Sequence, residues 1–474
     1  MSAYSILKTD GGRDSLSEES LNSFAARFGG RLISPEHAEY DRTRVIWNAM
    51  IDRRPGLIAQ CRNADDVVQA VRFARENRIL TAVRGAGHNI AGHSVCEGGL
   101  MIDLSPMKSV QVNAARRTVR VEPGVTLGEM DRATQAHGLA TPAGINSTTG
   151  VAGLALGGGF GWLSRKYGLT LDNLISAEVV TADGEQVRAS EGSYPDLFWG
   201  IRGGGGNLGV VTAFEFRAHP VGPEVLAGLI VHPFADAPRL LRQYRDCVAQ
   251  APDELTVWTV LRKAPPLPFL PVEVHGQMIL IFAACYAGPI EEGERALQPL
   301  RSLGRPIADG VGPGPFAGWQ SAFDPLMTPG MRNYWKSHNF TGLSDGLIDT
   351  VLEKVEQLPS AHSEAFIGHL GGAASRVPTE ATAYPHRDAM FVLNVHARWE
   401  DAGDDDRCIA WARDCFAAAG PFATGGVYIN FMPGDEAERV PAAYGANYQR
   451  LAALKREYDP DNLFRLNQNV RPGA

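Results

Sequence analysis

The pattern of apolar and polar residues changes along the chain, with short alternating elements before Pro220 and longer apolar strands after it. The apolar runs 57–61 and 80–83 predict short buried strands. Between them, Asn63 stands before apolar residues at helical spacing, which predicts a capped helix and therefore a β-α-β unit. Further strands are expected at 100–104, 109–112 and 118–121, followed by a helix over about 127–137.

Turn residues and longer strands organise the rest of the chain. Ala182-Asp183-Gly184 between two apolar runs predicts a hairpin, and residues 210–216 alternate as a strand does. The proline-rich stretch 264–271 predicts a surface loop, and a helix over 444–458 should end before Pro460. Apolar strands at 257–261, 278–283 and 390–395, with amphipathic helices such as 347–358 between them, are expected in a second region from residue 223.

Composition indicates an ordinary globular protein of two or three domains. The 474 residues are 44% hydrophobic and 21% charged, and the net charge of −8 argues against nucleic acid or an acidic membrane as a partner. The chain has no apolar run long enough to span a bilayer, and Met1 to Ser20 has no apolar signal segment. Six cysteines without a C-x-x-C pair predict reduced thiols, so a cytoplasmic protein is expected.

The stretch from Arg84 to His88 carries the strongest chemical signal. It reads Arg-Gly-Ala-Gly-His directly after a β-branched run. Glycines there leave backbone N–H groups free for an anion, and the imidazole is a nucleophile. Two alternatives remain at this point: an ordinary turn, or a zinc site formed by His88, His93 and Cys96.

Two more glycine-rich segments, 144–161 and 203–209, occur in the same region. Gly204 to Gly209 matches G-x-G-x-x-G, but a strand follows it where a dinucleotide-binding Rossmann unit requires a helix. Segment 150–161 has too many glycines for a stable helix. Three such segments favour one long ligand lying across all of them, and a flavin dinucleotide has the required length, phosphates and flat ring. The simpler alternative is that all three are turns.

Four motifs in this order resemble the covalent FAD oxidases of the berberine-bridge type, in the vanillyl-alcohol-oxidase superfamily. They are Arg84 to His88, Gly150 to Gly161, Arg202 to Val211, and Tyr458-Asp-Pro-Asp-Asn-Leu-Phe464. The resemblance runs from about residue 40 to the C-terminus. It implies an α+β fold with a PCMH-type FAD-binding domain of two subdomains and an inserted α+β substrate domain, an antiparallel sheet covered by helices. The expected boundaries are 1–17 for a flexible N-terminus, 18–222 for the FAD-binding domain (core about 53–222), 223–425 for the substrate domain, and 426–474 for a C-terminal segment that completes the FAD-binding domain.

The resemblance also implies the cofactor, FAD, and the residues that hold it. His88 would carry a covalent bond to the 8α-methyl group of the flavin. The loop around the diphosphate would comprise Arg84, Gly85, Ala86, Gly87, Asn89, Gly92, His93 and Ser94. Gly144, Thr149, Gly150, Gly153, Leu154 and Gly158 would lie along the ring and ribityl chain, Gly209, Val210 and Val211 near the adenine, and Tyr428, Asn430 and Asn469 would approach from the C-terminal segment.

The sequence departs from the family pattern where some members attach the flavin a second time. Asn146 stands at the position of the second attachment, a cysteine. Cys96 is too close to His88 in sequence to replace that cysteine and is expected to be a buried structural thiol. One covalent bond, through His88, is therefore predicted.

A second departure concerns the catalytic base. Carbohydrate-oxidising relatives carry a second tyrosine in the motif that reads Tyr428-Ile-Asn430-Phe431 here, and phenylalanine cannot accept a proton. His369, Tyr334 and His338, from the substrate domain, are the candidate replacements, beside Tyr428 itself. Each of them could equally be a hydrogen-bonded core residue.

Thr149 lies in the loop where the family controls access of oxygen to the flavin. A small side chain there favours an oxidase, although Thr149 could instead cap the adjoining turn. The expected activity is hydride transfer from a small, flat or hydrophobic, secondary-metabolite-like substrate to FAD, with O2 as the electron acceptor and no metal. The alternatives are an oxygenase or oxidative cyclase acting on a polyketide, and a dehydrogenase with another acceptor. The sequence is compatible with a monomer or a homodimer.

Overall fold

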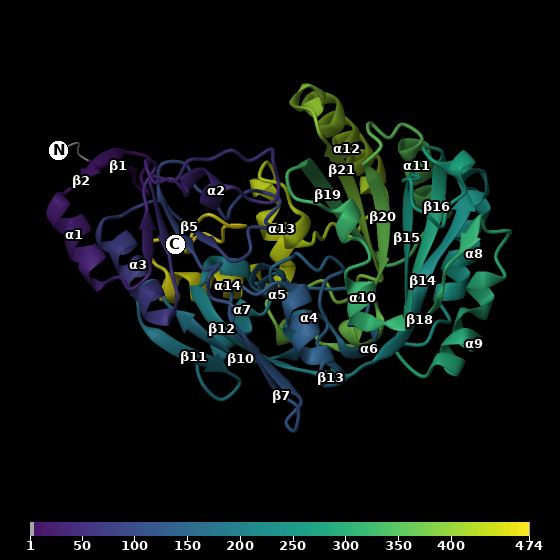
Figure 1. Ribbon diagram of the computed structural model, residues 1–474, viewed down its shortest axis with the longest axis horizontal. Helices are drawn as coiled ribbons and strands as arrows, with labels where there is room; N and C mark the ends of the chain where they lie inside the picture. The colour runs from purple at the N-terminus through teal and green to yellow at the C-terminus, as the bar shows by residue number, and fades with distance from the viewer. Residues whose placement is uncertain (1–3, 474) are drawn as a thin grey trace.

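The computed structural model describes residues 4–473, which fold around three main sheets (Figure 1). The first has the order β3-β4-β6-β5, and its last three strands are parallel. Asn63 accepts a hydrogen bond from the Asp66 N–H at 3.0 Å, so the predicted cap of the crossover helix α3 is confirmed. The bounds are β3 Arg31–Ile33, β4 Leu57–Gln60, α3 Ala64–Glu76, β5 Thr81–Arg84 and β6 Leu100–Asp103.

The second sheet is antiparallel, with the order β11-β10-β12-β8-β7. Its strands are β7 Val110–Asn113, β8 Thr118–Val121, β10 Leu174–Val180, β11 Gln186–Ser190 and β12 Val210–Arg217. Strands β10 and β11 pair across residues 182–184, so the predicted hairpin is confirmed. Helices α4 (Leu127–Gln135), α5 (Val151–Leu156) and α7 (Pro195–Ile201) contribute side chains to the core formed with this sheet.

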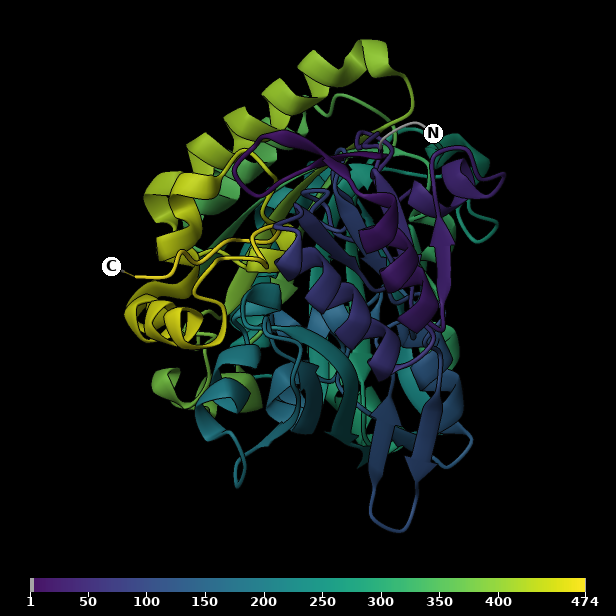
Figure 2. The ribbon, with the colours of Figure 1, turned by 90° about the vertical axis from the view of Figure 1, so that its left-hand side faces the viewer.

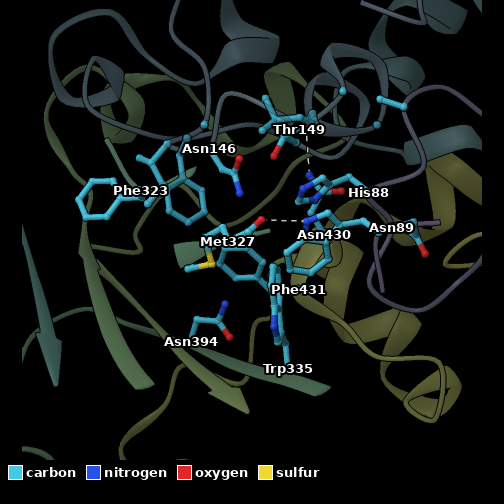
Figure 3. Close-up of a pocket in the computed structure, with 18 of the residues that line it drawn as sticks. His88, Asn89, Asn146, Thr149, Phe323, Met327, Trp335, Asn394, Asn430 and Phe431 are labelled. Carbon is cyan, nitrogen blue, oxygen red and sulfur yellow. Dashed lines mark hydrogen bonds between the residues drawn. The ribbon is translucent and has the colours of Figure 1, made fainter. Parts of the chain in front are cut away.

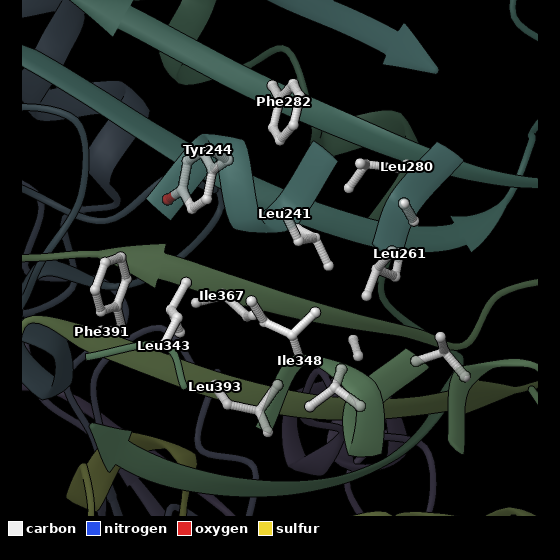
Figure 4. Packing of buried hydrophobic residues seen from close by; sticks show 14 of the residues in the cluster. Leu241, Tyr244, Leu261, Leu280, Phe282, Leu343, Ile348, Ile367, Phe391 and Leu393 are labelled. Atoms are coloured by element: carbon white, nitrogen blue, oxygen red, sulfur yellow. The ribbon is translucent and has the colours of Figure 1, made fainter. Parts of the chain in front are cut away.

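The third sheet has eight strands and begins at Glu224. Its main strands are β14 Glu224–Pro233, β15 Leu255–Lys263, β16 Met278–Tyr286, β19 Arg332–Phe340, β20 Glu364–His369 and β21 Phe391–Trp399, with β17 Ala308–Asp309 and β18 Gly312–Pro315 pairing with β14. One face packs against α8 (Ala237–Val248), α9 (Ile290–Arg301), α11 (Asp345–Val355) and α12 (Asp405–Ala419). Figure 4 shows part of this core, where Leu241 and Tyr244 of α8 and Ile348 of α11 meet side chains of the sheet. The opposite face is turned toward the first two sheets. The α+β fold with a helix-covered antiparallel sheet is thus confirmed.

The C-terminal segment returns to the second sheet, where it lies beside α7 (Figures 1 and 2). It contains α13 (Val440–Tyr444) and α14 (Tyr448–Tyr458), separated by a turn of 3-10 helix. The buried Lys455 ammonium donates to the Asp459 carboxylate at 2.5 Å and to the carbonyls of Asn207 and Phe464. These contacts fix the C-terminal segment against the glycine segment 203–209.

The remaining helices and strands connect these layers, and none of the helices within residues 4–473 is both long and apolar enough to cross a bilayer. They are β1 Tyr4–Leu7, β2 Arg13–Leu16, α1 Glu18–Arg27, α2 Tyr40–Arg44, β9 Leu139–Ala140, α6 Ser164–Tyr167, β13 His219–Pro220 and α10 Phe316–Gln320.

Two expectations about loose segments need correction. Residues 1–17 were expected to be flexible; residues 1–3 lie outside the described range, but β1 and β2 form a hairpin that buries Ile6 completely and binds the Gly98 carbonyl. An apolar side chain anchors this hairpin despite its polar sequence. The proline-rich stretch 264–271 is a loop as predicted, yet it is not wholly on the surface, because Leu267 and Leu270 turn inward against the large sheet.

Candidate active site

A cavity of about 710 Å³ lies between the large sheet and the two smaller ones (Figure 3). Its lining includes all three glycine-rich segments, the free face of the large sheet, and residues 428–431 and 466–468 of the C-terminal segment. Segments far apart in sequence therefore meet at one site. The ordinary-turn explanation does not account for this convergence.

His88 lies at the wall of this cavity, at the end of the loop after β5. The indole of Trp47 stacks on the imidazole with ring centroids 4.4 Å apart, and the backbone N–H of Trp47 donates to the Gly87 carbonyl at 3.0 Å. Asn48 donates to the carbonyls of Ile90 and Asn333, joining the loop to β19. The position and orientation of the imidazole are thus fixed by packing from a segment that no motif in the sequence marks.

The imidazole of His88 is uncharged at neutral pH. Burial disfavours the imidazolium and, with the charge of Arg398, lowers the pKa of His88 to about 4. The Nε2 atom is 3.5 Å from the Thr148 hydroxyl. A neutral imidazole keeps a free lone pair, which is the form needed for a nucleophile.

The glycines have two different roles around the cavity. A Cβ on Gly150 would meet Ala86 Cβ at 2.7 Å, and one on Gly161 would meet the Ala143 carbonyl at 2.1 Å, so these glycines allow the segments to pack against one another. Gly153 and Gly206 line the cavity, and a Cβ on either would meet nothing within 4 Å. These two positions leave open the space that a bound cofactor needs.

The C-terminal motif closes the cavity beside α5. The Tyr428 hydroxyl accepts hydrogen bonds of 2.9 Å from the Gly159 N–H and from Asn430 Nδ2, which also donates to the Leu154 carbonyl at 3.2 Å. Burial raises the pKa of Tyr428 to about 12, so the phenol is protonated and can donate. It is unsuited to act as a base at neutral pH.

Several buried polar atoms on the glycine side of the cavity have no protein partner within the described chain. They are His93 Nδ1, Ser94 Oγ and Asn467 Oδ1, and all three residues line the cavity. Buried polar groups without partners are costly, and a polar ligand would satisfy them. This mixture of donors, an acceptor and open glycine backbone fits a dinucleotide that carries phosphates, ribose hydroxyls and a flat ring.

Most residues that the resemblance assigned to the cofactor line the cavity. They are Gly85, Ala86, Gly87, His88, Asn89, His93, Ser94, Gly144, Thr149, Gly150, Gly153, Leu154, Gly209, Val210, Val211, Tyr428 and Asn430. Four do not. Arg84 donates to the Thr43 carbonyl and faces Asp103 instead, and Gly92 and Gly158 pack against Ile51 and Tyr428. Asn469 lies just beyond the lining residue Gln468.

The loop from Asn146 to Thr149 forms the edge of the cavity above His88 (Figure 3). The Asn146 side chain accepts from the Thr148 hydroxyl at 2.7 Å and from the Thr148 N–H at 3.1 Å, while the Thr149 N–H donates to the Asn146 carbonyl. The turn is therefore held by Asn146, Thr148 and the backbone. The Thr149 side chain is not needed as its cap.

The three base candidates from the substrate domain are wrong. His369 lies within hydrogen-bonding distance of Arg165 (2.9 Å) away from the cavity, where burial and that cation hold its pKa well below the usual range. Tyr334 donates to Asp435, and His338 lies 2.9 Å from the Phe416 carbonyl of α12. The even-numbered residues of β19 face the helices, because alternate side chains of a strand point to opposite faces.

The zinc alternative is also wrong. Within residues 4–473, His, Cys, Asp and Glu side chains form no group of three that could hold a metal ion. Cys96 is buried, and that burial raises the pKa of its thiol to about 12, which disfavours the thiolate that zinc requires.

A row of polar residues crosses the cavity face of the large sheet and was not recognised from the sequence. Arg262 pairs across strands with Glu364, Glu364 with His396, and His396 with Trp335. All four line the cavity. The sequence does contain a signal for this row, because each of its charged residues interrupts an apolar strand at a position on the cavity face of the sheet.

Comparison with known proteins agrees with this geometry. Residues 55–190 match the family model described as an FAD binding domain, and residues 427–471 match the model described as berberine and berberine like. The chain is 32% identical over 451 residues to the uncharacterized FAD-linked oxidoreductase YgaK of Bacillus subtilis, covering 94% of this chain and 97% of that protein.

Two further comparisons concern one enzyme type. The chain is 31% identical over 467 residues to (R)-6-hydroxynicotine oxidase of Paenarthrobacter nicotinovorans, covering 94% of this chain and 97% of the relative. The crystal structure of 6-hydroxy-D-nicotine oxidase from Arthrobacter nicotinovorans superposes with a TM-score of 0.85 at 30% identity, over 94% of this chain and 98% of the other. With the cavity, the glycine segments and the C-terminal motif in place, the chain belongs to the berberine-bridge-like family of FAD-linked oxidoreductases.

Proposed function

We propose that this protein is an oxidase that holds FAD through one covalent bond to His88 and uses O2 as the electron acceptor. The observation that carries the proposal is the neutral His88 imidazole, held by Trp47 at the wall of a cavity that the three glycine segments share. Asn146, in the loop above His88, offers no nucleophilic sulfur, which supports a single attachment.

When bound, the flavin would accept a hydride equivalent from the substrate and pass the electrons to O2. Around it, His93 and Ser94 would hold the polar part, and open backbone at Gly153 and Gly206 would admit it. Tyr428 and Asn430 fix α5 beside the ring site through the hydrogen bonds described above. The Thr149 side chain, which lines the cavity but does not hold the turn, keeps the path for a small molecule open.

The substrate would occupy the part of the cavity next to the large sheet. The ring of Phe431 lies there, with its centroid 5.6 Å from that of Trp335 and 5.9 Å from that of Phe366. These aromatic rings favour a substrate with a flat, apolar ring system, such as a secondary metabolite.

At the large sheet, His396 would accept the substrate proton, assisted by Glu364. His396 Nδ1 is 3.4 Å from Glu364 Oε1, and burial lowers the pKa of His396, so that the imidazole is neutral at pH 7 and able to take a proton. Glu364, held ionised by Arg262, would stabilise the imidazolium that results.

The test combines acid precipitation with rapid mixing. We expect the precipitated protein to remain yellow, and the reduced protein to regain its visible absorbance within seconds in air-saturated buffer. A colourless pellet refutes the covalent bond. A flavin that stays bleached for minutes indicates a dehydrogenase, and transfer of labelled oxygen from O2 to product indicates an oxygenase; either result refutes the oxidase assignment.

A further inference from the structure

Together with the neighbouring Arg398, the polar row on the large sheet forms a buried cluster that holds more positive than negative charge. Arg262 Nη1 donates to Glu364 Oε2 at 2.6 Å, and both side chains are almost completely buried. Arg398, two residues beyond His396 on β21, is 1% exposed. Its guanidinium has neutral partners, Asn333 Oδ1 at 3.3 Å and the Thr328 carbonyl at 2.7 Å.

The cluster therefore lacks one negative charge. No carboxylate within residues 4–473 lies within salt-bridge distance of Arg398. Burial lowers the pKa of Arg398 to about 10, an effect that the charge of Glu364 offsets in part and that of Arg262 adds to. With His396 neutral, two arginines and one glutamate leave a net charge of +1 behind the cavity wall. A buried charge without a counterion is unfavourable, and an anion in the adjacent cavity would relieve it.

Neutral polar atoms beside this cluster also lack partners. Both amide atoms of Asn394 and the indole Nε1 of Trp335 are buried and unpaired among the described residues. Asn394 lies opposite Phe366 across the strands and reaches into the cavity below Met327 and Phe431 (Figure 3). The two N–H donors and the amide oxygen of these side chains indicate a ligand that has polar atoms along its edge.

Aromatic rings fill the wall between these polar groups. Trp258 stacks on Phe366 at a centroid distance of 5.4 Å, and Phe431 lies edge-on to Phe366, Trp335 and Phe160. Arg262 is the one cationic side chain among the residues that line the described cavity. Flat apolar surfaces with a single cation at one edge select both shape and charge.

We propose that the substrate is a planar aromatic anion, a carboxylate or phenolate, whose charged oxygen binds at Arg262 while its ring lies among Trp258, Phe366 and Phe431. This inference rests on the proposed function only in taking the sheet side of the cavity as the substrate site. Asn394 and Trp335 hydrogen-bond polar atoms on the same ligand. The anion supplies the negative charge that the arginine cluster lacks.

The first test compares two isosteric probes on the flavin-containing protein, 2-naphthoate and 2-naphthamide, by quenching of tryptophan fluorescence at pH 7.5. We expect the naphthoate to bind at least tenfold more tightly, about 1.4 kcal/mol. Equal affinities, or tighter binding of the amide, overturn the proposal. Flavin content and reoxidation by O2 are measured on the same sample, so failure of the oxidase assignment is seen separately.

Variants assign the preference to Arg262. Arg262→Met should reduce naphthoate affinity at least tenfold and leave naphthamide affinity within twofold, whereas Arg262→Lys should retain most of the preference. Because R262M leaves Glu364 buried without its partner, the double variant R262M/E364M provides a neutral, apolar pair of similar volume. An undiminished preference for naphthoate in the folded double variant would refute the role of Arg262.

Discussion

Asp131 provides a sharp test of the contact between the two main parts of the molecule. Its carboxylate lies on α4, where Oδ2 accepts from Gln320 Nε2 of α10 at 3.1 Å and Oδ1 has no partner in the described chain. Gln320 also donates to the Gly144 carbonyl in the second glycine segment. Burial raises the pKa of Asp131 from 3.8 to about 7.

Ionisation of Asp131 destabilises the folded protein, because folding raises the pKa of its carboxyl group. The folded protein binds the Asp131 proton more tightly than the unfolded chain, so ionisation costs stability progressively from pH 3.8 to 7 and by a constant amount above that. The cost is about 2 kcal/mol at pH 5.5 and about 4 kcal/mol at pH 8.5, at 1.36 kcal/mol per pKa unit. Asp131→Asn removes the ionisation and keeps an oxygen for Gln320.

D131N should therefore unfold at a higher temperature, by about 2 °C at pH 5.5 and about 4 °C at pH 8.5, for an unfolding entropy of roughly 1 kcal/mol/K in a chain of 474 residues. Differential scanning fluorimetry at the two pH values measures this. Asp388→Asn, at an exposed position, is the matched control and should change the Tm equally little at both. An increase in Tm for D131N that does not grow with pH would show that the folded protein does not raise the pKa of Asp131.

Three further variants examine other contacts. Gly153→Val places its side chain in the open cavity and should reduce bound flavin at least fivefold, measured as visible absorbance per protein, with the Tm within 2 °C of the parent. Gly192→Val, in an open surface position, is the control and should keep full flavin. Full flavin in G153V would contradict the placement of the cofactor. Lys455→Met leaves the buried Asp459 carboxylate without its cation, so the free energy of unfolding measured in urea should fall by about 3–5 kcal/mol. A K455M variant as stable as the parent would contradict the buried ion pair. Tyr428→Phe leaves two donors without their acceptor and should cost about 1–3 kcal/mol in the same assay; no loss would show that those hydrogen bonds do not form.

The sequence was sufficient to predict the cofactor side of the site. Glycine clusters and the motif around Tyr428 are local signals, since each depends on a few adjacent residues with special backbone or hydrogen-bonding needs. The same holds for the Asn63 cap and the hairpin at 182–184. The cap and the hairpin lie at the predicted positions in the structure.

The substrate side could not be predicted in the same way. Strand β19 has polar residues on both faces, with Asn333 and Ser337 on one side and Lys336 and His338 on the other, so its pattern does not show which face meets the cavity. A shift of one residue exchanges the two sets. Tyr334 and His338 were therefore assigned to the wrong face.

Trp47 lies outside any periodic element, in the segment after α2. Its contact with His88 joins residues 41 positions apart through tertiary packing alone. No motif or spacing in the sequence marks such a contact. Residues of this kind become visible only when the folded arrangement is known.

The mass of one tryptic peptide shows whether His88 carries the flavin. Cleavage after Arg84 and Lys108 releases residues 85–108, which contain His88, His93 and Cys96. We expect this peptide to carry one FAD less two hydrogen atoms, and fragmentation to place the addition on His88. An unmodified peptide, or an addition at either of the other two residues, would contradict this expectation.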